Sequence, residues 1–567
     1  DLELKNKGYY YFKPDYILTK ADTTAGGHQV DLYVVAKHEE IPEQAYYVYR
    51  INDVYVFPNF RLDAERADTT KSKAEFYKGF YVVDRRKTFR PLVFEQAMQF
   101  QPGEVYNRTE QNLSLNRLVS LGTFKFVKNR FEAIHDPDYP MLNVYYYLTP
   151  YPKKSLRFEI GVASQNDSRM GTQSSISWRN RNAFRGAELL TVSLRGGYEA
   201  QAGGNVQRPP AFEGGAEVSL SIPRFLIPFV KVIPSSMFIP RTTILAGYDI
   251  TLRQQAYMIH SIRSSYGYVW KEDLRKEHRL FPFNVNYVKT DTLLTGLEPR
   301  FNFSNLLFNG LIIGPTYEYT FNGQAAGIKL DNYYFNGLID LSNNILGLVQ
   351  GASPDKPKTI FNTQYAQYIK LQADGRYYRN FGVHKNDMWA SRLIVGFGYP
   401  YGNSGQLPNI KQFFAGGASS LRGFRSRLVG PGVFDPTSIA AETGSLQFIE
   451  TLGDVKLEIN TEFRKHIYQF LNGAVFLDAG NIWTYYDDPR FPGGTFTKNF
   501  YKQLAVDAGV GLRLDFQIIL LRLDLAFPIR KPWLSNRDQW VFDQINPADK
   551  KWRQDNLIFN IAIGYPF

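Results

Sequence analysis

The chain has 567 residues and a net charge of +12, and its hydrophobic (44%) and charged (21%) fractions are close to those of globular proteins. This composition excludes disordered chains and coiled coils. Aromatic residues make up 16% of the chain beside 45 glycines, which predicts an all-β body of short strands and turns. Lys and Arg form no block, so the charge is weak support for binding nucleic acid or anionic lipid.

No apolar run approaches the roughly 18 residues that a membrane helix needs. The strongest candidates, 306–313 and 518–525, are interrupted by Asn309 and by Arg522 and Asp524. The absence of Cys excludes disulfides, thiolate zinc sites and thiol nucleophiles. Because residues 1–7 are polar and do not form a signal peptide, we expect a chain that is either cytoplasmic or already processed.

The first 150 residues predict a small α+β module. Strands are expected at 49–57, 123–127 and 142–148 and a helix at 91–98. A second helix, 107–121, opens with Asn107 as its N-cap and Glu110 three residues later. The segment Gly8 to Phe12 and the strand 30–36 partly repeat the pattern of 122–126 and 142–148. We therefore predict the C-terminal part of one module at 1–40, with its remaining elements upstream, and a complete module at 41–152; chance similarity of two strand pairs is the alternative.

From Lys154 onward the pattern changes to strict alternation without helical stretches. In 455–464 one face is apolar or Thr and the other is charged or amide. A soluble sandwich also alternates, but here charged residues continue on one face, strand after strand, with no helices to cover the apolar side. This favours a barrel in lipid over a sandwich.

Sixteen alternating segments can be counted between 153 and 567. An even number is typical of bacterial outer-membrane barrels. One connection, 401–453, is Gly-rich, aperiodic and long enough to predict a functional inserted loop. The strands are predicted to begin near 155, 171, 188, 213, 242, 258, 277, 310, 329, 363, 388, 454, 473, 504, 518 and 557.

Several motifs follow one another in the C-terminal third. The long loop contains Gly416, Gly417 and the tetrad Leu421, Arg422, Gly423 and Phe424. The strands after it carry Glu462 and a Phe-x-Asp-x-Gly-x-x-Trp pattern that includes Asp478, and the sequence ends on Phe567. In this order the motifs resemble those of the BamA/TamA superfamily of outer-membrane insertases, with Leu in place of Val in the loop tetrad. The N-terminal modules resemble POTRA domains, and the ending resembles Bacteroidota members of the TamL kind.

The resemblance implies a mostly β fold: a 16-stranded antiparallel transmembrane β-barrel preceded by small α+β POTRA domains. Because alternate residues of a strand face the same side, Glu462 and Asp478 are expected on the inner face of the barrel. An Arg422 folded into the barrel would reach both carboxylates. A solvated Arg422 and ordinary wetted wall carboxylates are the alternatives.

The last strand, 557–567, reads with Tyr565 and Phe567 facing outward. Because Pro566 lacks an N–H and Gly564 packs poorly, we expect weak pairing with the first strand, or simply the end of a strand. The predicted lateral gate comprises residues of the first and last strands: Leu156, Phe158, Ile160, Ile563, Gly564, Tyr565, Pro566 and Phe567.

The function implied is folding and insertion of β-barrel or other envelope proteins through this gate. The alternatives are a two-partner-type secretion channel, a TamA-like subunit working with a periplasmic bridge in protein or lipid transport, and a plain porin. No catalytic motif, cofactor or metal site is predicted, so we expect no enzyme.

The partners expected are outer-membrane lipids, unfolded outer-membrane clients and TamB-like or Bam-like accessory subunits, but no nucleic acid. The predicted location is the bacterial outer membrane, with the POTRA domains in the periplasm.

Overall fold

The computed structural model describes residues 2–24, 26–27, 29–37, 40–61, 74–134, 139–164, 169–201, 210–228, 236–254, 257–292, 308–327, 329–382, 387–436, 438, 451–516, 519–535 and 537–567. Within these residues, no helix is both long and apolar enough to cross a membrane. The chain divides into two compact units. The first comprises Asp1–Ser155, Arg179–Leu190 and Leu220–Thr242, and the second comprises Leu156–Trp178, Thr191–Ser219 and Thr243–Phe567.

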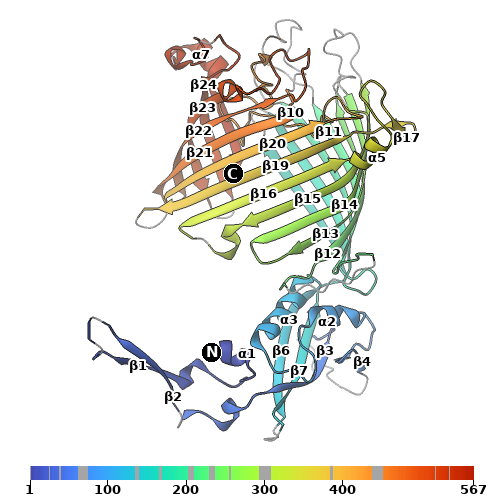
Figure 1. Ribbon diagram of the computed structural model, residues 1–567, viewed down its shortest axis with the longest axis vertical. Coiled ribbons are helices and arrows are strands. Elements are labelled where there is room, and N and C mark those ends of the chain that lie inside the picture. Colours follow the sequence, from blue (N-terminus) through green and yellow to red (C-terminus); the bar gives the residue numbers. More distant parts are fainter. Residues whose placement is uncertain are drawn as a thin grey trace. The chain divides into compact units, whose positions relative to one another are not determined.

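A five-stranded mixed sheet with two helices forms the body of the first unit (Figure 1). The side chain of Asn107 accepts hydrogen bonds from the backbone N–H groups of Thr109 and Glu110, as predicted for the cap of α3. Burial raises the pKa of Tyr106 in its core to about 12. The elements are β3 (Arg50–Phe57), β4 (Glu75–Tyr77), β5 (Phe80–Val82), α2 (Leu92–Ala97), α3 (Arg108–Ser120), β6 (Phe124–Ile134) and β7 (Met141–Pro150).

The strand order of this sheet is β4-β5-β3-β7-β6. The hairpin β4–β5 was not predicted, since each strand has only three residues and no measurable alternation. The predicted strands 49–57 and 142–148 correspond to β3 and β7, which both lie inside the sheet. The open edges among the described residues are therefore β4 and β6.

A separate two-stranded hairpin precedes this sheet. Helix α1 (Leu2–Asn6) ends before Gly8, and β1 (Ile17–Asp22) pairs with β2 (Asp31–Ala36). The order helix, glycine, hairpin parallels α3, Gly122, β6 and β7. The repeat therefore exists at the level of element order, although the aromatic segment after Gly8 is not a strand.

The second unit is built on a sixteen-stranded antiparallel barrel (Figure 1). Its strands follow one another in chain order around the wall. They are β8 (Lys154–Ser164), β9 (Arg169–Asn180), β10 (Leu189–Gln201), β11 (Ala211–Ile222), β12 (Arg241–Arg253), β13 (Tyr257–Lys271), β14 (Lys276–Thr292), β15 (Gly310–Asn322), β16 (Asp331–Ser342), β19 (Tyr368–Phe381), β20 (Asp387–Pro400), β21 (Val455–Tyr468), β22 (Leu471–Trp483), β23 (Ala505–Asp515), β24 (Leu520–Arg530) and β25 (Ile558–Ile563).

Fifteen of these strands begin within two residues of their predicted starts. The exception is β19, expected near 363, because residues there form the small hairpin β17 (Thr359–Ile360) and β18 (Thr363–Gln364) instead. The expectation of no helix after Lys154 was also wrong, since α5 (Asn344–Val349) and α7 (Lys550–Asn556) lie in connections.

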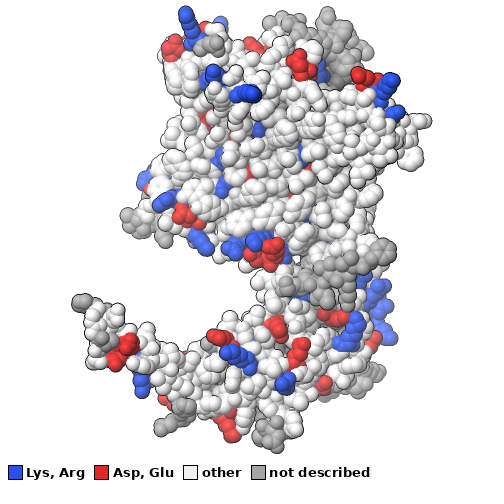
Figure 2. All heavy atoms as spheres, viewed as in Figure 1, with Lys and Arg blue, Asp and Glu red and all other residues white. Residues whose placement is uncertain are grey.

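The two faces of the wall differ as the alternation predicts. Outward side chains such as Phe158 and Val510 are apolar and more than half exposed, whereas inward Glu462, Asp478 and Asp507 are fully buried. Figure 2 shows charged side chains sparse across the middle of the barrel face in view and gathered nearer its rims. An apolar band between polar rims is the surface that hydrocarbon requires.

Candidate functional site

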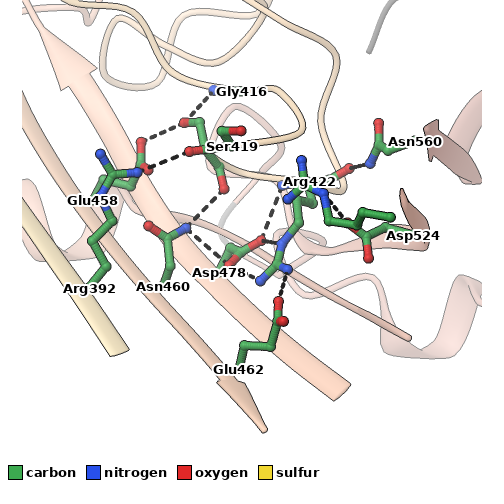
Figure 3. Close-up of polar contacts among 12 residues, drawn as sticks. Arg392, Gly416, Ser419, Arg422, Glu458, Asn460, Glu462, Asp478, Asp524 and Asn560 are labelled. Carbon is green, nitrogen blue, oxygen red and sulfur yellow. Dashed lines mark hydrogen bonds and ion pairs between the residues drawn. The ribbon is translucent and has the colours of Figure 1, made fainter. Parts of the chain in front are cut away.

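The long connection between β20 and β21 folds back into the barrel and places Arg422 against the inner wall (Figure 3). The Arg422 Nε and Nη2 donate to the two carboxylate oxygens of Asp478 on β22 at 2.7 and 2.9 Å. Its Nη1 donates to Glu462 on β21, and its backbone N–H also reaches Asp478 at 3.2 Å. The predicted contact with both carboxylates is confirmed, and no part of Arg422 is exposed.

An aromatic ring completes the environment of the Arg422 guanidinium. The Cζ atom lies 3.5 Å from the centroid of the Phe476 ring, an inward residue two positions before Asp478. A planar cation can donate hydrogen bonds in its plane and stack on a ring at the same time, which a lysine ammonium cannot do equally well. This position therefore favours Arg specifically.

Glu462 binds two further arginines besides Arg422. Arg464 Nε lies 2.8 Å and Arg513 Nη2 2.9 Å from its carboxylate. Arg513 also pairs with Asp524 on β24 at 2.5 Å, and Arg522 lies 3.5 Å from the same aspartate. We call this set the arginine–carboxylate cluster: Arg422, Arg464, Arg513 and Arg522 with Glu462, Asp478, Asp507 and Asp524.

The eight ionisable side chains of this cluster are all buried. An isolated buried charge is very costly, so the charges depend on their mutual pairing. Only Arg422 of the eight residues comes from the loop. The other seven lie on β21 to β24 of the wall.

Glycines in the loop allow the backbone to approach the wall closely. A β-carbon on Gly416, which has φ +94°, would lie 2.3 Å from the carbonyl oxygen of Arg425. Gly417 also has positive φ, +121°. Gly423 packs directly on Asp507, which explains why the residue after Arg422 carries no side chain.

The inward residues of β21 before Glu462 bind the loop backbone and one hydroxyl group. Lys456 Nζ donates to the carbonyl of Phe414 at 2.9 Å, and Asn460 Nδ2 donates to that of Ser420 at 2.9 Å. The Ser420 hydroxyl donates to Glu458. Each inward side chain from 456 to 462 therefore contacts the loop.

Two hydrophobic residues of the tetrad pack on the loop side of the site. Leu421 and Phe424 join a buried apolar cluster with Phe413, Ala415, Val429, Ile482 and Ala505. The Phe424 ring also makes an edge contact with Trp533, with centroids 6.0 Å apart. The tetrad thus places one charged side chain toward the wall and two apolar side chains within the folded loop.

A second ion pair fixes the beginning of the loop to another part of the wall. Lys411 Nζ lies 2.6 Å from Asp340 on β16, and Lys370 on β19 donates to the Lys411 carbonyl at 2.7 Å. On β20, Arg392 pairs with Asp374 and donates to the carbonyl of Ser419 at 3.1 Å. The loop is consequently held by a run of neighbouring strands from β16 to β22.

The end of the loop is held by Asp454, directly before β21. Its carboxylate accepts hydrogen bonds from Gln412 Nε2 at 3.2 Å and from the backbone N–H of Tyr485 at 3.1 Å. Burial raises the pKa of Asp454 above its ordinary value. Residues 437 and 439–450 of the predicted loop lie outside the described residues.

The last residues do not continue the outward alternation that was predicted. Strand β25 ends at Ile563, and Gly564 takes φ +89°. Phe567 is buried with Tyr378 and Ala390, while Tyr565 stacks on Arg464 at 4.1 Å. The prediction that Tyr565 and Phe567 face outward was therefore wrong, because a left-handed turn at Gly564 directs the chain inward.

The other predicted gate residues lie on the end strands of the sheet. The strand order runs from β25 to β8, and no described register joins these two strands. Leu156, Phe158, Ile160 and Ile563 are all more than 60% exposed, as expected for lipid-facing residues. Pro566 is buried with Phe567 rather than paired in a ladder.

Sequence reasoning did not identify Arg392, Lys411, Arg513, Arg522, Asp524 or Asn560 as site residues. The alternation of residues along each strand does identify the strand residues of this set as inward-facing. It does not reveal which inward residue meets which, because that depends on the register between strands and on the path of the loop.

Comparisons with known proteins match the region that contains this loop. Residues 359–546, which include the long loop and the strands beside it, match the Omp85 superfamily domain. The outer membrane protein assembly factor BamA of Neisseria meningitidis serogroup B is 25% identical over 181 residues, 30% of this chain and 21% of that protein. The matched region thus spans about a fifth of that relative's length.

One solved structure shares the fold of this chain. The crystal structure of BamA from Haemophilus ducreyi lacking POTRA domains 1–3 superposes with a TM-score of 0.58 at 14% identity, covering 99% of this chain and 91% of that one. CdiB from Acinetobacter baumannii superposes with a TM-score of 0.47 at 12% identity, covering 99% and 79%.

Proposed function

We propose that the chain, whose residues 359–546 match the Omp85 superfamily domain, acts as an outer-membrane barrel that folds and inserts other envelope proteins through the seam between β8 and β25. The single observation that carries this proposal is the mismatch between the two end strands. Strand β8 has eleven residues, whereas β25 has six and then leaves the wall. A full-length strand thus faces a short one at the place where the barrel must close.

The short ladder has an energetic consequence. Each unpaired backbone group in a nonpolar surrounding costs about 1 to 3 kcal/mol, so a seam with few hydrogen bonds is the least costly place to open. An exposed β8 edge would then pair with a strand of a client by β-augmentation. Burial of client apolar surface in lipid supplies the driving force, and no nucleotide is consumed.

The anchored loop has a supporting role in this mechanism. Its ion pairs tie β16, β21 and β22 to one insertion, so this part of the wall keeps its shape while the seam opens. The loop residues contribute positioning rather than chemistry.

Accessory partners are expected at the N-terminal α+β domain, which we take to be a periplasmic POTRA domain. Strand addition there would use β6, an eleven-residue strand at the sheet edge, or the short β4. The central positions of β3 and β7 exclude them from this role.

Engineered disulfides test the seam directly, because the natural chain contains no Cys. One Cys would replace Leu156 or Ile160 on β8 and one would replace Ile563 or Phe559 on β25, since these residues face the same side. Pairs that bring Cα atoms to about 4.4–6.8 Å will oxidise. We expect the oxidised pair to stop assembly of client barrels into the outer membrane and a reductant to restore it.

A matched control uses Val510→Cys with Leu525→Cys, which are paired across β23 and β24 and also face outward. This disulfide should leave client assembly unchanged. If the locked seam supports normal assembly, lateral opening is not the mechanism. Loss of a single exported protein on depletion, instead of many barrels, would favour a secretion channel.

A further inference from the structure

The segment 564–567, here called the tail segment, lies inside the barrel and contacts strands far from β25. Phe567 packs on Tyr378 of β19 and Ala390 of β20, with Met388 and Tyr334 beside them. Phe567 is only 7% exposed, although Tyr565 remains 42% exposed. In the sheet order, four strands lie between β25 and β20. The tail segment therefore crosses the inner face of the wall.

Arg464 connects the tail segment to the loop anchor. Its guanidinium lies 4.1 Å from the Tyr565 ring centroid and 5.8 Å from that of Phe567. The Nε of the same group donates to Glu462, which also receives Arg422. Because one carboxylate orients both arginines, displacement of Arg464 changes the partner of Arg422.

A second and independent link runs from the body of β25. The Nδ2 of Asn560 donates to the backbone carbonyl of Arg422 at 3.0 Å (Figure 3), and Asn560 is 1% exposed. The strand that precedes the tail segment and the tail segment itself thus contact the same loop residue, one directly and one through Arg464 and Glu462.

We propose that the inner wall around Arg464, Tyr378 and Ala390 is a binding site for the tail segment, and that its occupation is energetically coupled to docking of the loop at Arg422. A bound tail segment holds Arg464 on Glu462 and keeps Asn560 at the Arg422 carbonyl. A released tail segment frees both groups and weakens the loop anchor. Coupling is reciprocal, so release of the loop must also loosen the tail segment.

This inference concerns two parts of the same barrel and holds whether or not the seam admits clients. Its failure is therefore separate from failure of the proposed function. The experiment measures docking of each part rather than assembly activity.

The reporter for loop docking is Ala415→Cys, a single thiol at a loop position that is 1% exposed. The full chain in detergent micelles is treated with a maleimide, and the labelling rate reports how often the loop leaves the wall. We expect Phe567→Ala to raise this rate roughly 5- to 150-fold, the usual range for coupled sites. The matched control is Phe559→Ala, which removes a phenylalanine ring from the preceding strand β25 at an outward position that is 57% exposed.

The reverse reporter is Pro566→Cys, at a buried position of the tail segment that spares both aromatic rings. Arg422→Lys should raise its labelling rate, whereas Arg425→Ala in the same loop should not. If Phe567→Ala prevents folding, Tyr565→Leu tests the stacking on Arg464 while keeping an apolar side chain. Unchanged Ala415→Cys labelling in a folded tail variant, or a rise as large in Phe559→Ala, overturns the proposal.

Discussion

A β-carbon on Gly423 would lie 2.4 Å from the β-carbon of Asp507, so the loop backbone and β23 touch where any side chain would separate them. We predict that Gly423→Ala displaces the loop from the wall. Overpacking of a fixed contact costs about 1 to 3 kcal/mol. The measurement is the temperature at which the folded, fast-migrating form is lost on gels.

The control for this substitution lies in the same loop. Gly405 has no atom within 4 Å of an added β-carbon, so Gly405→Ala should leave the transition temperature unchanged. Equal behaviour of the two variants would contradict the close packing of Gly423 on Asp507.

Removal of the Arg422 side chain should release the loop. Arg422→Ala leaves Asp478 buried without its guanidinium partner and removes one of the three arginines that bind Glu462. Breaking such a buried pair costs about 3 to 5 kcal/mol. Arg422→Lys keeps the charge but loses the paired N–H donation to Asp478 and the stacking on Phe476, so we expect a smaller loss of stability than in Arg422→Ala. Thermal unfolding followed by circular dichroism, with Arg425→Ala as reference, measures the difference; a Lys variant as stable as the natural chain would argue against a specific role for the guanidinium.

The ion pair between Lys411 and Asp340 is a second test of loop anchoring. Asp340→Asn leaves the Lys411 ammonium near a neutral group, and we expect a loss of about 1 to 3 kcal/mol in loop docking, read from hydrogen exchange of residues 408–415. Asp291→Asn is the matched control, since Asp291 lies 3.8 Å from Lys289 and both side chains are about half exposed. Similar exchange in both variants would mean that the Lys411 pair does not hold the loop.

The raised pKa of Asp454 predicts a pH dependence of the loop base. Since its folded pKa lies above the unfolded value, the group contributes stability at pH values below its unfolded pKa, and this contribution is lost as pH rises through the folded pKa. Unfolding temperatures should therefore increase from neutral pH toward acid pH by more in the natural chain than in Asp454→Asn. Parallel pH profiles would exclude Asp454 as the source.

The barrel could be predicted from sequence because alternation is a local property. Each strand buries one face regardless of its neighbours, so the period of two marks starts such as Lys154 and Val455 within two residues. The contact of Arg422 with Glu462 and Asp478 was predictable as well, because parity placed both carboxylates inside and motif resemblance placed the arginine near them.

The direction of the tail segment could not be predicted in this way. Alternation assigns Tyr565 and Phe567 to the outer face, and only a positive φ at Gly564 together with the remote side chains Arg464 and Ala390 reverses that assignment. The partners of Arg513 and Asp524 were missed for a related reason. The register between two strands depends on how they pair and cannot be predicted from the sequence of either strand alone.

The positions of the arginine–carboxylate cluster in the sequence determine when the loop can dock during folding of the chain. Glu462, Asp478, Arg513 and Asp524 come from four successive strands, all of which follow the loop in sequence. When Arg422 leaves the synthesis machinery none of its partners yet exists, and each appears only as β21 to β24 assemble. Docking of Arg422 is consequently a late step, and a chain arrested before β21 should lack this anchor even where Lys411 has already paired with Asp340 on β16.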